Sequence, residues 1–306
     1  MKRLFSLILC VALCATATDA SAKRNPDANG DGVLRILAIG NSFSDDGMEH
    51  LPALLENMGI KKVELARLYV GGCSVERHMQ FFDKQQSAYT FYTSKAGENK
   101  WVKHAEKRSI QSALAMGEWD IITMQQASGY SGQYETIKPH LERLVAVVKK
   151  AQPQAHLAWH ITWSYSTASK HQHYHHYDNS QAKMDTAIMQ AVLQIRNDFD
   201  CFDYFIPSGT AIRMLRLSPV NNAPNDFTRD GYHLDYGAGR YAAACVWYET
   251  LVRPFAGKRV VDSSLEISNK GKGSRDAVGD VARYSRKAAE MAAKKPFTVR
   301  PVKVKR

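Results

Sequence analysis

The stretch that decides the fold is Val33-Leu34-Arg35-Ile36-Leu37-Ala38-Ile39-Gly40, followed at once by Asn41-Ser42-Phe43-Ser44. Apart from Arg35, the first eight residues are apolar; they contain β-branched side chains and end in glycine, which predicts a short buried strand. A serine placed directly after such a strand and before a helix has its hydroxyl exposed at the edge of the sheet. The helix that follows adds backbone N–H groups that can stabilise a developing anion. Ser42 is therefore a candidate nucleophile, against the alternative that Ser42 or Ser44 only caps the helix.

Short apolar strands alternate with amphipathic helices along the rest of the chain. Further strands are expected at 63–70, 119–124, 156–162 and 202–206, and helices at 49–58, 136–150, 184–196 and 239–251. This alternation predicts an α/β fold, a three-layer α/β/α sandwich with a parallel sheet of about five strands. The interval 89–104 fits the alternation poorly, and its aromatic-rich ends suggest a hairpin.

Three further motifs lie at predicted strand or loop ends of the same sheet edge: Gly71-Gly72, Gln125-Gln126 and Asp230-Gly231-Tyr232-His233. A glycine pair lets the backbone approach a substrate closely, and a side-chain amide can donate to an oxyanion. Asp and His three residues apart can fold so that the carboxylate meets Nδ1 while Nε2 faces a serine. Each motif alone has an ordinary structural explanation, as a turn, a bracing glutamine or a chance pair. Their common position indicates a serine hydrolase.

The ordered set of motifs resembles the SGNH hydrolase superfamily, the GDSL-type esterases and lipases, over about residues 33–255. The resemblance implies Ser42 as nucleophile, His233 as base and Asp230 as its orienter. It also implies an oxyanion hole formed by the N–H groups of Ser42 and Gly72, since Gly72 matches the oxyanion glycine better than Gly71, and an SGNH/flavodoxin-like fold. The closest branch carries Gly-Asn-Ser-Phe-Ser, a Gln-Gln third block and a late Pro-Ser-Gly-Thr-Ala segment, here Pro207–Ala211.

Two departures from the family pattern concern the oxyanion hole. Asn41 stands where the family has aspartate before the nucleophile, and the third block lacks the usual asparagine. We expect Gln126 to replace that asparagine, with Gln125 as the alternative. Loss of one oxyanion donor typically costs ~10²–10³ in turnover.

An aromatic loop, Trp159–Tyr165, precedes a histidine-rich segment, His171–Asp178. Aromatic faces stack on sugar rings and amides bond their hydroxyls, so a carbohydrate pocket is expected. The expected substrate-binding residues are Asn41, Gln125, Trp163 and Tyr165. The histidines of 171–176 could instead ligate zinc or copper, but we favour a substrate lid or a solvated loop. No metal or other cofactor is expected.

The two ends of the chain differ from its middle. Residues 1–22 have a positive start, an apolar stretch and Ala20-Ser21-Ala22, as in a signal peptide, so an exported protein, periplasmic or secreted, without a stable membrane span is expected. Residues 23–256 would form the hydrolase domain and 257–306 a basic helical extension. That extension holds fourteen lysine and arginine residues against five acidic ones, so it is either a solvated helix face or a polyanion-binding surface. Export disfavours nucleic acid as a partner.

These observations predict an exported serine esterase acting on an ester substrate, such as an acylated or acetylated carbohydrate. Two alternatives remain: a non-catalytic glycan-binding protein of the same fold, and a metal-dependent hydrolase that uses His171–His176.

Overall fold

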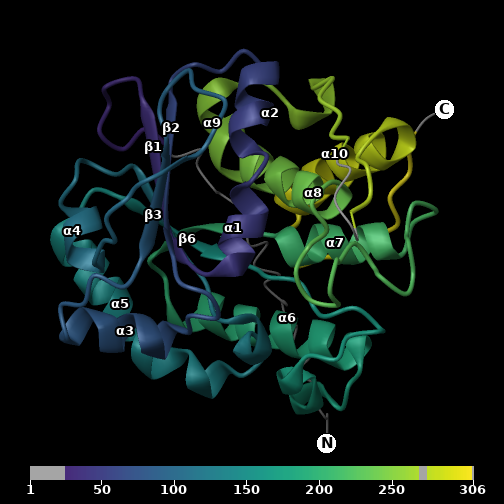
Figure 1. Ribbon diagram of the computed structural model, residues 1–306, viewed down its shortest axis with the longest axis horizontal. Coiled ribbons are helices and arrows are strands. Elements are labelled where there is room, and N and C mark those ends of the chain that lie inside the picture. The colour runs from purple at the N-terminus through teal and green to yellow at the C-terminus, as the bar shows by residue number, and fades with distance from the viewer. Residues whose placement is uncertain (1–24, 269–273, 305–306) are drawn as a thin grey trace, which may run out of the picture.

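A seven-stranded sheet forms the centre of the computed structural model, which describes residues 25–268 and 274–304 (Figure 1). Across the sheet the strands run in the order β4 (Val102–Lys103), β3 (Thr90–Ser94), β2 (Val63–Tyr69), β1 (Leu34–Gly40), β5 (Ile121–Met124), β6 (His156–His160) and β7 (Phe202–Ile206).

Five neighbouring strands of the sheet, β2, β1, β5, β6 and β7, run parallel to one another. Beyond β2, β3 and β4 extend the sheet as an antiparallel hairpin. The predicted α/β class, the parallel strands and the hairpin excursion are therefore confirmed. The strand order reverses direction at β1: the strands next along the chain lie on one side of it, beginning with β2, and the later strands lie on the other side, beginning with β5. In open parallel sheets a ligand site forms at such a point, just past the carboxyl ends of the strands. Asn41 and Gln125 directly follow those two strand ends.

Helices cover both faces of the sheet. One layer contains α1 (Ser42–Met48), α2 (Leu51–Asn57), α7 (Ser208–Arg216), α8 (Ala238–Trp247), the short α9 (Arg253–Ala256) and α10 (Gly279–Lys294). The other contains α3 (Val75–Asp83), α4 (Ile110–Leu114), α5 (Lys138–Ala151) and α6 (Gln181–Asp198). Short 3₁₀ or π segments occur at η1 (Ser128–Tyr130), η2 (Tyr134–Thr136), η3 (Gln172–Tyr177), η4 (Tyr248–Val252) and η5 (Val260–Asp262).

The basic C-terminal segment packs against the main body of the protein. Its helix α10 contacts α7 and α8, and its small residues Ala288, Ala289 and Ala292 are buried in the common core. The expected leader at 1–22 lies outside the described residues. Within the described ranges no helix is long and apolar enough to cross a membrane, and Cys73, Cys201 and Cys245 are free thiols.

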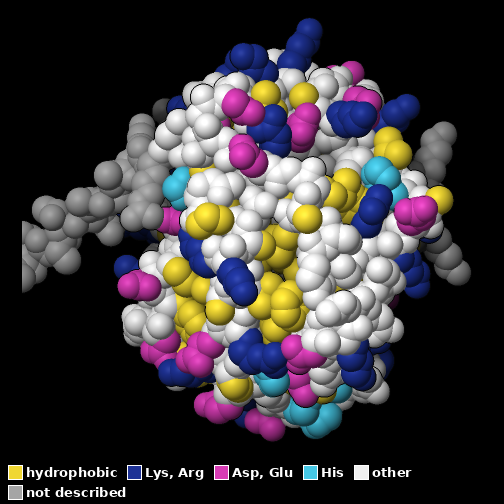
Figure 2. Space-filling model, turned by 90° about the vertical axis from the view of Figure 1, so that its left-hand side faces the viewer, with side chains coloured by type: hydrophobic (Ala, Val, Ile, Leu, Met, Phe, Trp, Pro, Cys, Tyr) yellow, Lys and Arg dark blue, Asp and Glu magenta, His cyan; other side chains and the backbone are white. Residues whose placement is uncertain are grey.

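An apolar cavity of about 680 Å³ lies between α3, α4 and α5, lined mainly by Phe82, Leu114, Ala115, Ala146 and Val147. These helices lie on the side of the molecule where apolar side chains gather (Figure 2). The cavity adjoins the segments that lead into β5 and β6, so it lies at the amino-terminal edge of the sheet. It is therefore separate from the edge where the predicted motifs meet.

Candidate active site

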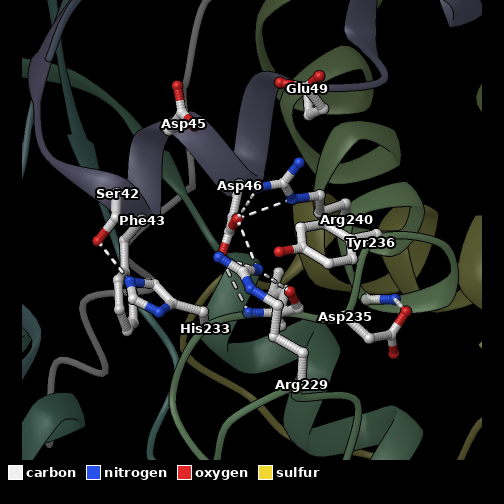
Figure 3. Close-up of polar contacts among 12 residues, drawn as sticks. Ser42, Phe43, Asp45, Asp46, Glu49, Arg229, His233, Asp235, Tyr236 and Arg240 are labelled. Carbon is white, nitrogen blue, oxygen red and sulfur yellow. Dashed lines mark hydrogen bonds and ion pairs between the residues drawn. The ribbon is translucent and has the colours of Figure 1, made fainter. Parts of the chain in front are cut away.

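Ser42, His233 and Asp230 lie in a hydrogen-bonded chain at the carboxyl edge of the sheet. Ser42 Oγ is 2.8 Å from His233 Nε2, and His233 Nδ1 is 2.7 Å from Asp230 Oδ2. Ser42 is the first residue of α1 and half-buried, with its hydroxyl turned toward the imidazole (Figure 3). A carboxylate on Nδ1 holds the tautomer whose Nε2 can accept a proton from the hydroxyl. This is the arrangement required to activate a serine nucleophile.

The loop that carries the base is built around its own carboxylate. Asp230 Oδ1 also accepts the backbone N–H groups of His233 at 2.8 Å and Tyr232 at 3.2 Å. Partial burial opposes ionisation of Asp230, but the bonds from His233 and these N–H groups outweigh it and keep the pKa of the carboxyl below its usual value. Gly231 has a φ of +92°, which glycine adopts without strain. The loop can therefore close tightly enough for Asp230 to reach the ring of His233.

A buried carboxylate on α1 fastens this loop to the helix of the nucleophile. Asp46, one turn after Ser42, is fully buried and accepts the Leu234 N–H at 2.9 Å. It also pairs with Arg240 at 2.7 Å and with Arg229 at 3.1 Å (Figure 3). Both guanidinium groups lie over the ring of Tyr236. Asp46 therefore fixes the spacing between the helix of Ser42 and the loop of His233, and sequence reasoning missed it.

The position of Asn41 explains the departure from the aspartate of the family pattern. Its Nδ2 donates to the carbonyl oxygen of Cys73 at 3.0 Å and to that of Gln126 at 3.4 Å, while its Oδ1 accepts the Phe43 N–H at 2.9 Å. An aspartate would place a carboxylate against two carbonyl oxygens and would offer them no donor. The amide joins the loops after β1, β2 and β5 at one point.

Gln125 continues this network into the interior. Its Nε2 donates to Asn41 Oδ1 at 2.7 Å, and its Oε1 lies 2.6 Å from His160 Nδ1. Because the amide oxygen accepts, His160 donates from Nδ1, and its Nε2 accepts from the hydroxyl of Ser208 at 2.9 Å. All four side chains are between 0 and 2 % exposed. Asn41 and Gln125, expected to contact substrate, instead orient the loops of the site.

Gln126, the expected oxyanion donor, is buried and bonded to the neighbouring loops. Its Oε1 accepts the N–H groups of Val75 at 3.0 Å and Ala127 at 2.8 Å, and its Nε2 donates to Thr136. The side chain is 2 % exposed. The amide therefore braces the start of α3 and the η2 turn, and no step of a mechanism is assigned to it.

Gly72, the expected backbone donor, follows β2 in the loop next to Cys73. It lies exposed in the loop after β2 with a φ of +60°, and the bond from Asn41 to the Cys73 carbonyl holds this loop beside the start of α1. A side chain at this φ would be strained, which favours glycine at this position although no neighbouring atom would meet a Cβ.

The aromatic loop, Trp159–Tyr165, packs against residues next to the triad. Trp163 stacks on Phe43 with ring centroids 4.3 Å apart and donates to the Tyr232 carbonyl at 2.8 Å, and Tyr165 bonds Ser128. Both side chains are buried, which leaves them no surface for the expected contact with substrate. The half-buried rings of Tyr232 and His171, 4.6 Å apart, form the aromatic rim beside His233 instead. Tyr232 could have been found from sequence, since it directly precedes the base.

The histidine-rich segment forms η3 and stacks on itself. His173 and His176 are parallel with centroids 5.3 Å apart, and His175 bonds the carbonyl of Gln172. Within the described part of the chain, no three or more His, Cys, Asp or Glu side chains are grouped as metal ligands.

Replacing Asp46 by asparagine should destabilise the protein. The neutral amide would remove the direct ion-pair partner of Arg229 and Arg240, and breaking a buried ion pair costs about 3–5 kcal/mol. Urea unfolding measures the loss. The control is Asp45→Asn, because Asp45 pairs with Arg67 at 3.0 Å but is only partly buried. An Asp46→Asn loss no larger than that of the control would contradict the fastening role.

An Asn41→Asp variant, which restores the residue of the family pattern, should be less stable and less active here. The carboxylate would face the carbonyl oxygens of Cys73 and Gln126, and an uncompensated buried polar group costs about 1–3 kcal/mol or more when charged. Unfolding at pH 7 tests this. Because protonation removes the repulsion, the deficit should shrink toward pH 4, and a deficit independent of pH would argue against the repulsion.

The buried imidazole of His160 should make stability depend on pH. Burial lowers the pKa of His160 to about 3, whereas a histidine in an unfolded chain has a pKa near ~6.5. The unfolded chain therefore binds more protons between these values, so this contribution to stability falls as pH falls, by at most ~1.4 kcal/mol per unit. His160→Asn, which keeps a donor toward Gln125, removes this pH-dependent contribution to the free energy of unfolding. Its stability relative to the parent should improve from pH 7 to pH 5, and an unchanged difference would contradict the assignment.

Comparisons with known proteins agree on the family. A family model described as a domain of unknown function, DUF4886, matches residues 35–276, and no curated protein matches the chain. A DUF4886 family protein of known structure from Bacteroides uniformis is 34% identical, with a TM-score of 0.77 over 88% of this chain and 97% of that one. Fainter likenesses are to a candidate SGNH hydrolase from Slackia heliotrinireducens (21% identity, TM-score 0.49, 72% of this chain and 99% of that one) and to an acetylxylan esterase from Geobacillus stearothermophilus (11%, 0.46, 72% and 94%). Because the family model spans most of the chain, this protein belongs to the DUF4886 family.

Proposed function

We propose that this protein is a serine esterase that uses Ser42 as nucleophile, His233 as general base and acid, and Asp230 as the group that orients His233. The observation that carries the proposal is the continuous pair of bonds, 2.8 Å from Ser42 to His233 and 2.7 Å from His233 to Asp230. The order of the sequence motifs, which resembles that of SGNH hydrolases, supports it independently.

The reaction begins when His233 Nε2 takes the hydroxyl proton and Ser42 Oγ attacks the ester carbonyl carbon. The negative charge that develops on the carbonyl oxygen is stabilised by the N–H groups of Ser42 and Gly72. His233 then donates the proton to the leaving alcohol, and an acyl-serine remains. Water attacks this acyl group with His233 again as base, which releases the acid and restores Ser42. The proton and both products are accounted for without any other group.

The substrate proposed is an O-acyl ester, such as an acetyl group, on a glycan outside the cytoplasm. The signal-like sequence of residues 1–22 motivates the location. The aromatic rim of Tyr232 and His171 beside the base suits a sugar ring. Neither glutamine of the third block is free to donate to the oxyanion, so two backbone donors serve where the family pattern supplies a third.

Ser42→Ala should reduce kcat on p-nitrophenyl acetate and on acetylated xylo-oligosaccharides by at least ~10³-fold, because the nucleophile and its activation are lost together. Asp230→Asn should also lower kcat strongly, since the imidazole tautomer is no longer held. Ser44→Ala is the matched control: its hydroxyl is on the same helix but bonds the Asn41 carbonyl, and kcat should stay within about tenfold.

A fluorescent organophosphonate distinguishes the enzyme from a non-catalytic glycan-binding protein. We expect labelling of the parent protein at Ser42 and none in Ser42→Ala. A folded parent protein that binds acetylated oligosaccharides but neither reacts with the probe nor releases acid would rule out the esterase.

A further inference from the structure

A cleft of about 380 Å³ on the C-terminal segment is lined by charges that neither the fold nor the triad requires. Its walls are Arg259, Val261, Arg283, Arg286, Lys287, Glu290, Lys303 and Val304. They come from the start of η5, from α10 and from the chain after α10. The cleft is therefore an assembled feature of three separate segments with five cationic side chains and one carboxylate, and its volume is within the range of small-ligand sites.

Arg286 is the unusual member of this group. Its side chain is only 9 % exposed, and Nη1 donates to the Tyr241 hydroxyl at 2.9 Å and to the Leu265 carbonyl at 3.1 Å. None of the ion pairs around the cleft, within residues 25–268 and 274–304, involves it. Burial raises the pKa of Tyr241, so that hydroxyl stays neutral. A buried guanidinium normally has a counter-charge, because burying an unpaired charge is costly.

The carboxylate that lines the cleft forms ion pairs with cations other than Arg286. Glu290 is itself buried and pairs with Lys287 at 2.7 Å, with Lys294 at 3.5 Å and with Arg259 at 3.8 Å. Arg283 pairs with the exposed Asp280 at the rim. Glu290 thus holds the cations of the cleft in place, while within the described residues Arg286 forms no ion pair with it.

We propose that this cleft binds a tetrahedral oxyanion, a phosphate or sulfate group, carried on a molecule of about sugar size. The planar donors of arginine match such oxygens in pairs, and lysine adds a point charge. Arg286 is the buried anchor, and Arg283, Lys287 and Lys303 are the rim that meets the rest of the ligand. The site is independent of the Ser42 triad and of the esterase proposal.

Calorimetry on the full chain at 150 mM NaCl tests the site, with inorganic phosphate, glucose 6-phosphate and a sulfated disaccharide as probes. Saturable binding to the parent protein is expected, and Arg283→Gln with Lys287→Gln should weaken it at least ~10-fold, because charge-assisted bonds are lost. The matched control, Arg143→Gln with Lys183→Gln on α5 and α6, removes the same charge from exposed positions elsewhere and should leave affinity unchanged.

Arg286→Lys keeps the charge but removes the fork of donors, and it should weaken binding several-fold. Because it also loses bonds to Tyr241 and Leu265, binding is measured below the thermal unfolding temperature of the variant. Equal weakening in the control pair would show that net charge alone attracts the anion and would overturn the proposal. Binding only to anionic lipid vesicles, or equally well to acetate and galacturonate, would overturn it as well. Unchanged ester hydrolysis in the Arg283/Lys287 variant separates this result from the fate of the proposed triad.

Discussion

The bond on which the rest of the site depends joins Asp46 to the loop of His233. A serine and an imidazole must meet within hydrogen-bonding distance although 191 positions separate them in sequence. The buried carboxylate of Asp46 bridges that separation directly, since it lies on the helix of Ser42 and accepts the N–H of the residue after His233. Arg229 and Arg240 neutralise it from two sides. A carboxylate bonded in this way is held in place, so the helix and the loop are aligned by a directional contact and not only by apolar packing.

A second network, made of neutral amides, sets the other half of the site. The bonds from Ser208 through His160 and Gln125 to Asn41 run across the ends of β6, β5 and β1. In this series of hydrogen bonds each side chain has a fixed donor and a fixed acceptor. Because Asn41 Oδ1 accepts from Gln125, the Asn41 N–H groups point to the loop of Gly72, where one of them donates to the Cys73 carbonyl. In this family member, the third block therefore acts as a support for the nucleophile loop. The proposed oxyanion hole then consists of backbone donors, with a site that is compact and largely formed before a ligand arrives.

Charge is distributed unevenly over the protein, and the structure separates its uses. Near the triad, the arginines are paired with Asp46 or, in the case of Arg67, with Asp45 and Glu49. In the C-terminal segment acidic side chains of the described ranges pair with Arg259, Arg283, Lys287 and Lys294, and Arg286 instead donates to the neutral Tyr241 hydroxyl and Leu265 carbonyl. The apolar cavity at the opposite edge of the sheet is lined by few charges. Three regions of different chemistry are thus supported by one core.

The sequence by itself determined the α/β class, the parallel strands and the placing of the motifs at one sheet edge, because these follow from local hydrophobic periodicity and from the direction of parallel strands. It also indicated Ser42, Asp230 and His233, since a motif that ends a strand or closes a glycine-containing loop is visible in a short window. The helices at 75–83, 110–114 and 208–216 were not predicted, because all three are short, with nine, five and nine residues, and follow loops whose ends carry no clear periodic signal. Only the tertiary structure decided that Asn41, Gln125, Gln126, Trp163 and Tyr165 are buried supports, and that Asp46, Tyr232 and His171 surround the base. Burial and hydrogen-bond partners depend on segments brought together from distant parts of the chain, and no local pattern of residues records which of them will meet.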